Sequence, residues 1–138
     1  MSPASNLATA VGLKPPDERP ARTGVAQVLR YYELVDQGDV PGLVGLFEPD
    51  AVYCRPGYEP MVGHDGLTEF YRDQRVIREG RHIITDVVAA SSQVAVRGEF
   101  NGVLHDGRAV SLRFSDFFEI GDGGAFRRRD TYFFAPLV

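Results

Sequence analysis

The spacing of apolar residues changes near Gly80, and this change limits the folds open to the 138-residue chain. Before Gly80, apolar residues recur every three or four positions, as on one face of a helix. After Gly80 they alternate with polar residues and are rich in β-branched and aromatic types, as in strands. The sequence therefore predicts an α+β fold in which three N-terminal helices pack on a curved, mainly antiparallel β-sheet.

Capping residues and turn residues set the expected bounds of these elements. We expect helices from Val25 to about Gly38, after Asp39, and from Leu67 to Gly80, with a short strand at 51–54 and a Pro- and Gly-rich loop at 55–64. Four further strands are expected at 83–89, 94–104, 109–120 and 125–134. Residues 1–22 hold four prolines without periodicity, so we expect a flexible arm there and one domain at 23–138.

The composition argues against several classes of protein. Lys and Arg total 15 against 19 Asp and Glu, a net charge of −4, so the chain lacks the basic surface that nucleic acids and anionic membranes attract. No apolar run approaches the roughly 18 residues of a membrane-spanning helix. The N-terminal sequence also lacks the features of a secretory signal. We therefore expect a cytoplasmic protein with no nucleic-acid or membrane partner.

Asp116 is the strongest candidate for chemistry, because strand alternation places it in an apolar row between Phe114 and Phe118. Burial raises the pKa of a carboxyl group unless a cation lies beside it. If the GDGG stretch is the whole loop of the last hairpin, Arg129 lies directly opposite Asp116. The ion pair would keep Asp116 charged, as a base or an electrostatic stabiliser. Without it, the acid could stay protonated and donate a hydrogen bond. The alternative is a structural acid paired to a neighbouring strand or a turn N–H.

Tyrosines and one arginine are the next candidates. Tyr31 and Tyr32 lie about 100° apart on the first helix, so at least one should face the space beneath the sheet, with Tyr71 as a possible partner. Arg55 follows the short strand, two residues after Tyr53, and suits an enolate or carboxylate oxygen. The alternatives are core aromatic residues and a solvated surface charge.

The histidines bear on a possible metal site, and the aromatic residues of the outer sheet face bear on a possible partner subunit. His82, at an expected strand start, could reach the pocket, but no His, Cys or carboxylate spacing favours a metal site. On the last two strands, Phe117, Tyr132 and Phe134 belong to the row that faces away from the helices. An exposed sheet face would not keep these aromatics, so we expect a homodimer through the outer sheet face.

Four stretches together resemble a known superfamily: LRYYELVDQGDVPGLVGLFEPDAVYCRPGYEP, GLTEFYR, FSDFFEIGDGG and DTYFF. They are similar to NTF2-like proteins, and within these to ketosteroid isomerases and SnoaL-like polyketide cyclases. The resemblance covers the chain from about Val25 to its C-terminus. It implies a cone-shaped α+β fold with an apolar pocket, frequent dimers and no cofactor.

The resemblance also implies roles for individual residues. Tyr31 matches the isomerase phenol that donates to the substrate oxygen, Tyr71 matches a supporting tyrosine, and Asp116 matches the acid of the oxyanion hole. Two isomerase positions differ: Arg55 stands where the catalytic base is expected, and Phe47 replaces a third tyrosine. SnoaL-like cyclases use a sheet aspartate as acid and base, which favours that role for Asp116.

Together these arguments predict a cofactor-independent acid/base enzyme, a cyclase or isomerase, acting on an apolar carbonyl compound of polyketide or steroid type. The predicted catalytic residues are Asp116, Tyr31 and Arg55. The predicted substrate-binding residues are Tyr71, Tyr53, Phe47, Phe114, Phe118, Arg129, Phe133 and His82. The alternatives are a non-catalytic ligand-binding or dimerisation module and an epoxide hydrolase-like or dehydratase-like enzyme. The epoxide hydrolase alternative requires an Asp-Arg-Asp set, and Asp130 belongs to the opposite row from Arg129.

Overall fold

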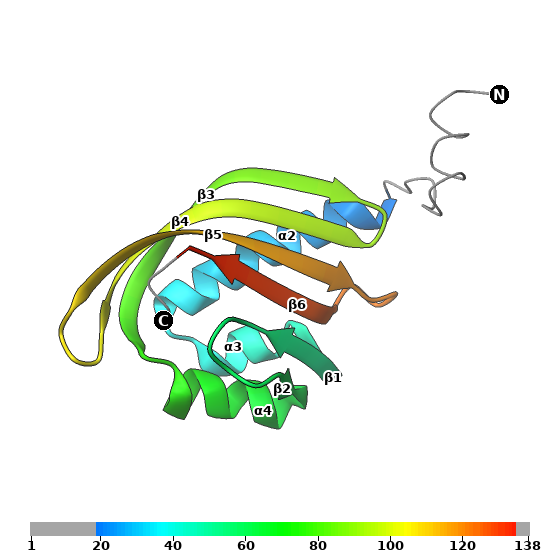
Figure 1. Ribbon diagram of the computed structural model, residues 1–138. Helices are drawn as coiled ribbons and strands as arrows, with labels where there is room; N and C mark the ends of the chain where they lie inside the picture. Colours follow the sequence, from blue (N-terminus) through cyan, green and yellow to red (C-terminus); the bar gives the residue numbers. More distant parts are fainter. Residues whose placement is uncertain (1–18, 135–138) are drawn as a thin grey trace.

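The computed structural model describes residues 19–134, which form helices and one curved sheet (Figure 1). In chain order the helical elements are α2 (Arg19–Gln37), α3 (Val40–Val44), α4 (Gly63–Glu69) and the π-helical turn η1 (Phe70–Gln74). The strands are β1 (Phe47–Cys54), β2 (Met61–Val62), β3 (Ile77–Ala90), β4 (Gln93–Leu104), β5 (Ala109–Ile120) and β6 (Phe126–Phe133). None of the helices in this part of the chain is long and apolar enough to cross a membrane.

The six strands form one mixed sheet in the order β2-β1-β6-β5-β4-β3. Only β1 and β6 are parallel, and the other neighbouring pairs are antiparallel. Strands β3 to β6 curve over α2, which packs against β3, β4 and β5, while α3 and α4 lie at the β1 and β2 end (Figure 1). The fold is therefore α+β with a curved sheet, as the sequence predicts.

The buried face of α2 follows from its residue spacing. Val28, Tyr31, Tyr32 and Val35 occupy positions i, i+3, i+4 and i+7 of one helical face, and each is at most 6% exposed. Gly38, with a φ of +74°, ends the helix in the left-handed conformation that glycine tolerates. Asp39 then accepts a hydrogen bond from the N–H of Gly42 at 2.9 Å and caps α3. The predicted end of the first helix near Gly38 and the predicted start of the second helix after Asp39 are confirmed, whereas α2 begins at Arg19, before the predicted Val25.

Strand alternation on β5 is also confirmed. The predicted inward row is buried throughout: Leu112, Phe114, Asp116, Phe118 and Ile120. Phe117, in the opposite row, is 47% exposed. The same alternation on β6 buries Arg129 and Thr131 and exposes Tyr132. Because side chains of a strand alternate between its two faces, the two buried rows bring charged groups beneath the sheet.

Other predicted bounds are wrong. The third helix, expected to end at Gly80, ends at Gln74, and Gly80 lies inside β3. The second helix stops at Val44, and β1 begins at Phe47, four residues before the strand predicted at 51–54. The loop expected at 55–64 contains β2 and the start of α4. The arm predicted at 1–22 lies mostly outside the described residues, and α2 begins within it.

Glycines in β3 and β4 allow the sheet to approach aromatic side chains closely. A Cβ added at Gly80 would lie 2.2 Å from Cζ of Phe100. A Cβ added at Gly98 would lie 2.6 Å from the carbonyl oxygen of Ile83 and 2.9 Å from Cζ of Phe114. A glycine inside a strand often marks such a close approach. Gly80 is therefore a packing residue of the sheet and not a helix terminator.

The Gly98→Ala variant is expected to lose about 1–3 kcal/mol of unfolding free energy, because the added methyl group must displace backbone as well as the Phe114 ring. Urea unfolding followed by circular dichroism measures this loss. Gly123→Ala is the matched control, since its added Cβ meets nothing within 4 Å. Equal stabilities of the two variants would show that the sheet relaxes around position 98 without cost.

Candidate functional site

A buried ion pair joins β5 and β6 beneath the sheet. Nη2 of Arg129 donates to Oδ2 of Asp116 at 2.9 Å. Asp116 is fully buried and Arg129 is 4% exposed. Two charges of opposite sign in such a place are kept only when they are paired and hydrogen-bonded. The predicted pairing of Asp116 with Arg129 is therefore present.

The register that led to this prediction is nevertheless wrong. Asp116 lies directly opposite Thr131, and Arg129 lies opposite Phe118, two residues away from the predicted pairing. A bulge between Glu119 and Ile120 accounts for part of this shift. Because side chains repeat every two residues along a strand, a shift of two keeps Arg129 on the face of Asp116. The ion pair then forms along the diagonal between the strands.

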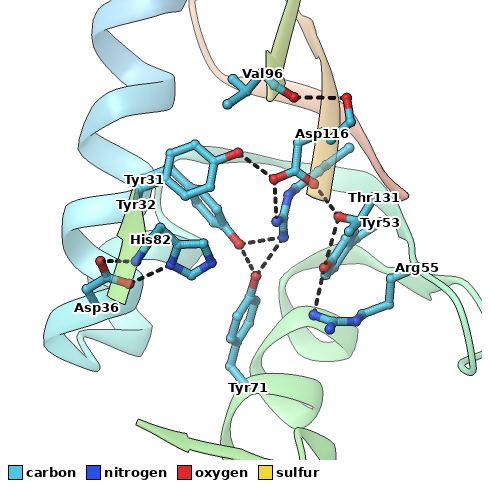
Figure 2. Close-up of polar contacts among 12 residues, drawn as sticks. Tyr31, Tyr32, Asp36, Tyr53, Arg55, Tyr71, His82, Val96, Asp116 and Thr131 are labelled. Carbon is cyan, nitrogen blue, oxygen red and sulfur yellow. Dashed lines mark hydrogen bonds and ion pairs between the residues drawn. The ribbon is translucent and has the colours of Figure 1, made fainter. Parts of the chain in front are cut away.

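Asp116 is held by hydroxyl groups as well as by the arginine. The hydroxyl of Tyr32 donates to Oδ2, and the hydroxyl of Thr131 donates to Oδ1 (Figure 2). Burial by itself would raise the pKa of Asp116. The Arg129 charge and the hydrogen bonds from Arg129, Thr131 and Tyr32 outweigh burial and hold the pKa below its ordinary value. Asp116 is thus an ionised carboxylate at neutral pH.

The other side of the Arg129 guanidinium holds two tyrosines. Nη1 donates to the hydroxyl of Tyr31 at 2.5 Å and to that of Tyr71 at 3.1 Å. The two hydroxyls are also hydrogen-bonded to each other (Figure 2). The guanidinium carbon lies 4.6 Å and 4.4 Å from the ring centres of Tyr31 and Tyr53. Arg129 is therefore fixed between its carboxylate on one side and the tyrosine hydroxyls on the other.

The Tyr31 and Tyr71 hydroxyls keep one proton to donate. Burial is the main cause that raises both pKa values, so both phenols are neutral at pH 7. Two neutral hydroxyls carry two protons, and their mutual hydrogen bond uses one. Within residues 19–134 neither hydroxyl has another acceptor. The remaining proton is available to an oxygen atom of a ligand.

A small cavity of about 30 Å³ lies beside these hydroxyls. Its polar lining consists of three arginines, two tyrosines, one threonine and one histidine: Arg55, Arg75, Arg129, Tyr31, Tyr71, Thr131 and His82. Its apolar lining includes Val35, Ile77, Phe100, Leu112, Phe114 and Phe133. Asp116 does not line the cavity, because Arg129 and Thr131 lie between them. Asp116 therefore acts on the cavity only through its partners.

His82 lies on β3 and lines the cavity, and Asp36 of α2 holds it through two hydrogen bonds. Its Nδ1 donates to Oδ1 of Asp36 at 2.6 Å, and its backbone N–H donates to Oδ2 at 2.9 Å (Figure 2). The ring stacks on Phe100 with centroids 4.8 Å apart. Burial lowers the pKa of His82 more than Asp36 raises it. His82 is thus neutral at pH 7 with Nε2 on the ring edge opposite Asp36.

Arg55 lies at another part of the lining. Its Nη1 donates to the hydroxyl of Tyr53 at 3.0 Å, and that hydroxyl is hydrogen-bonded to Thr131 (Figure 2). The guanidinium carbon of Arg55 lies within 5.2–6.0 Å of four ring centres, those of Phe70, Phe133, Tyr58 and Tyr53. These contacts connect Arg55 through Tyr53 and Thr131 to Asp116.

Some of the other predicted residues line the cavity and some do not. Tyr71, Phe114, Phe133, His82 and Arg129 line the cavity. Tyr53, Phe47 and Phe118 do not line it. Tyr53 holds Arg55, whereas Phe47 and Phe118 pack edge-on against the Tyr31 ring. The tyrosine hydroxyl that binds Asp116 belongs to Tyr32, whereas the sequence predicts the main role for Tyr31.

Sequence reasoning missed three residues of the site: Asp36, Arg75 and Thr131. Asp36 lies four residues after Tyr32, hence on the same helical face, which was a usable signal. Thr131 lies two residues after Arg129 on the same strand, so the alternation that buries Arg129 also predicts a buried Thr131. Arg75 had no signal, because it was expected within the third helix and in fact follows the π-helical turn. No cluster of three or more potential metal ligands occurs in the described part of the chain.

A comparison with protein-family models now identifies the chain. The SnoaL-like domain model matches residues 28–128. The chain belongs to the SnoaL-like domain family. The match spans strands β1 to β5 of this SnoaL-like domain and only the start of β6, and it confirms the resemblance to NTF2-like and SnoaL-like proteins drawn from the sequence. A comparison with curated protein sequences gives no match.

Solved structures of low sequence identity share the fold of this SnoaL-like domain. An NTF2-like protein of unknown function from Burkholderia pseudomallei K96243 has a TM-score of 0.75 and 21% identity over 81% of this chain and 91% of its own. The epoxide hydrolase/cyclase-like enzyme SalBIII, of pyran ring formation in the polyether salinomycin, gives 0.73 and 18% over 82% and 92%. A putative SnoaL-like polyketide cyclase from Jannaschia sp. CCS1 gives 0.72 and 14% over 87% and 91%.

The lowered pKa of Asp116 predicts a specific loss of stability in acid. Below about pH 4 the unfolded chain takes up a proton at this position before the folded protein does. The unfolded state then binds more protons, so falling pH favours unfolding. The stability that Asp116 contributes is present above about pH 4 and disappears as the pH falls through its folded pKa.

Urea unfolding of the wild type and of Asp116→Asn between about pH 6 and about pH 3 measures this contribution. We expect the difference in unfolding free energy between the two proteins to stay constant down to about pH 4 and to shrink below that pH. A difference that stays constant over this range would mean that Asp116 has the same pKa in the folded and the unfolded protein.

Proposed function

We propose that this SnoaL-like domain is a cofactor-independent enzyme that moves protons next to the carbonyl group of an apolar, polyketide- or steroid-like small molecule. The observation that carries the proposal is the buried network in which Asp116 fixes Arg129, and Arg129 presents Tyr31 and Tyr71 to the cavity. Donors fixed before the reaction stabilise negative charge that develops on oxygen. The likeness to SnoaL-like and cyclase-like structures supports this reaction class.

In the proposed reaction, the substrate carbonyl oxygen lies at the Tyr31 and Tyr71 hydroxyls. Removal of a proton from the neighbouring carbon leaves an enolate, whose negative oxygen accepts the spare phenol proton in a hydrogen bond and lies near the Arg129 charge. Asp116 takes the role of electrostatic stabiliser, the alternative that follows from its ion pair, and it does so without touching substrate. Arg55 adds positive charge at the cavity lining.

His82 is the proposed proton acceptor. Among the titratable groups that line the cavity, the arginines and tyrosines are protonated at neutral pH, and only His82 has a basic form ready to accept. Its hydrogen bond to Asp36 fixes the tautomer with Nε2 unprotonated. The resulting imidazolium can return the proton to another carbon, which completes an isomerisation, or to a leaving hydroxyl, which completes a dehydration.

Exchange of hydrogen for deuterium next to the carbonyl of an apolar ketone such as 2-tetralone, followed by NMR in D2O, tests the proposal. We expect the wild type to accelerate exchange with saturation, and the Tyr31→Phe/Tyr71→Phe variant to lose about 10²–10³ of the rate. Tyr58→Phe is the control, because this tyrosine lies outside the cavity lining. Ligand binding without any exchange would instead support a non-catalytic binding module.

The small cavity is the observation that favours that second candidate. About 30 Å³ holds little more than a water molecule, so a substrate must displace side chains at the lining before it binds. An epoxide hydrolase-like site has less support. Asp130 binds Arg128 at 2.7 Å and 2.9 Å on the far side of β6, so Arg129 keeps a single carboxylate partner in the described residues.

A homodimer through the outer sheet face is part of the proposal. Phe117, Tyr132 and Phe134 on this face are 47%, 57% and 68% exposed, and the Phe117 and Tyr132 rings are in edge contact at 5.9 Å. Val88 adds a further exposed apolar side chain at 67%. Light scattering tests this: the wild type should be dimeric and Tyr132→Glu monomeric. A monomeric wild type would overturn it.

A further inference from the structure

We infer that the cavity takes an anionic ligand, an apolar carboxylate or keto acid, whose charge is recognised by Arg75. The inference rests on the proposed function in that it assigns a substrate class to the same cavity. It depends on a residue that has no role in the oxyanion network. Its support comes from the contacts of Arg75, the charge balance of the lining and the apolar remainder of the cavity.

Arg75 reaches the cavity from the end of the π-helical turn η1. Its backbone N–H donates to the carbonyl of Phe70 at 2.8 Å, which closes the wide turn, and the chain is extended from Arg75 onward. Such turns widen the helix locally and occur often at functional sites. The guanidinium carbon lies 5.8 Å from the ring centre of Tyr71. The turn thus brings Tyr71 and Arg75 to the same cavity.

The Arg75 guanidinium has no carboxylate partner among the described residues. Its Nε is buried and has no hydrogen-bond partner, and no ion pair to Arg75 occurs within residues 19–134. Burial, with a smaller effect of the nearby Arg55 charge, lowers its pKa, yet an arginine stays protonated in proteins. Arg75 is half-buried, and its buried Nε lacks the hydrogen-bond partner that buried polar groups normally have, so a ligand that supplies an acceptor and a negative charge would satisfy it.

The charged groups that line the cavity are all positive. Three arginines line it, and no Asp or Glu does. Asp116 pairs with Arg129, and Asp36 binds the neutral His82. Arg129 is already bound by Asp116, whereas Arg75 forms no ion pair within residues 19–134.

The ligand's remaining chemistry follows from the apolar lining. Val35, Ile77, Phe100, Leu112 and Phe114 surround the polar groups and suit a ring or a branched hydrocarbon. A guanidinium group binds a carboxylate through two parallel hydrogen bonds, which fixes orientation as well as charge. A carboxylate on Arg75 and a carbonyl oxygen at the Tyr31 hydroxyl together describe an apolar keto acid.

Calorimetric titration with carboxylates and their matched amides tests the inference. The probes are benzoate with benzamide, cyclohexanecarboxylate with its amide, and 2-naphthoate with its amide. We expect at least one carboxylate to bind the wild type at least tenfold more tightly than its amide. This comparison uses the unaltered protein, so it does not depend on the folding of a variant. If no carboxylate of the series binds more tightly than its amide, the inference is wrong.

Two variants then assign the preference to Arg75. Arg75→Gln should abolish the carboxylate preference while leaving amide binding within about twofold. Arg72→Gln is the matched control, because Arg72 is exposed and lies outside the cavity lining, and it should keep the preference. An unchanged preference in Arg75→Gln would overturn the assignment.

Failure here differs from failure of the proposed function. Binding of a carboxylate requires no proton transfer. Carboxylate preference without any exchange of ketone protons would overturn the enzyme and keep the anion site. Exchange of neutral ketones without carboxylate preference would overturn the anion site and keep the enzyme.

Discussion

Replacement of Asp116 by alanine is expected to lower the unfolding free energy by about 3–5 kcal/mol, the usual cost of leaving one member of a buried ion pair alone. The change leaves the Arg129 guanidinium 4% exposed and without a carboxylate. It also leaves the Tyr32 and Thr131 hydroxyls without their shared acceptor. Urea unfolding monitored by circular dichroism measures the loss, and Asp116→Asn, which keeps the side-chain shape, provides a milder second variant.

Two further proteins make this result interpretable. Replacing both partners, as Asp116→Leu with Arg129→Met, should recover most of the lost stability, because no buried charge remains. Asp86→Ala removes an exposed carboxylate from its cross-strand pair with Arg97 and should have a much smaller effect. If Asp116→Ala is no less stable than Asp86→Ala, the burial of Asp116 described here is incorrect.

Replacement of His82 by glutamine is expected to reduce the rate of proton exchange about 10²–10⁴-fold, the range typical of a general base. His82 is the lining group with a neutral basic form, and Asp36 holds its Nδ1 at 2.6 Å. Glutamine keeps a hydrogen-bonding side chain but cannot accept a proton at neutral pH. Exchange rates at saturating ketone, compared with ketone affinity, separate a lost base from lost binding.

The rate of proton exchange is also expected to change with pH in a definite direction. Only neutral His82 accepts a proton, so the rate should rise with pH through the His82 pKa and level off above it. Burial places that pKa below its ordinary value of about 6.5, although Asp36 opposes the shift, and the charges of Arg75 and Arg129 lower it further. The plateau is therefore expected by about pH 7.

Asp36→Asn and His105→Gln serve as controls for His82. Asp36→Asn removes the charge that favours protonated His82, so the rising part of the profile should move to lower pH while the rate falls. His105 lies in an exposed turn outside the cavity lining, and His105→Gln should leave both rate and profile unchanged. A His82→Gln enzyme with wild-type exchange would exclude His82 as the base.

The sequence predicted those parts of the site that depend on local periodicity. The two-residue repeat of β5 placed Asp116 in a buried row, and the same repeat on β6 placed Arg129 beneath the sheet. The ion pair was predicted correctly despite the wrong register, because a shift of two residues keeps Arg129 on the same face of the sheet as Asp116. The helical repeat of α2 buried Tyr31 and Tyr32 together.

The sequence could not predict contacts that depend on where distant elements meet. Asp36 and His82 are 46 residues apart, and only the packing of α2 on β3 brings them together. Arg75 enters the cavity because a π-helical turn replaces the last turns of the expected helix, a change in hydrogen bonding that apolar spacing does not report. The volume of the cavity depends on side-chain packing in the same way.

Absorption spectroscopy of bound 4-nitrophenol tests the central claim most directly, since the phenol and its phenolate absorb at different wavelengths. If Arg129 and the Tyr31 and Tyr71 hydroxyls stabilise a negative oxygen in the cavity, the bound ligand will ionise at a lower pH than in water. The Tyr31→Phe variant should reverse most of that shift. A bound nitrophenol that stays protonated at pH values where it ionises in water would contradict the account.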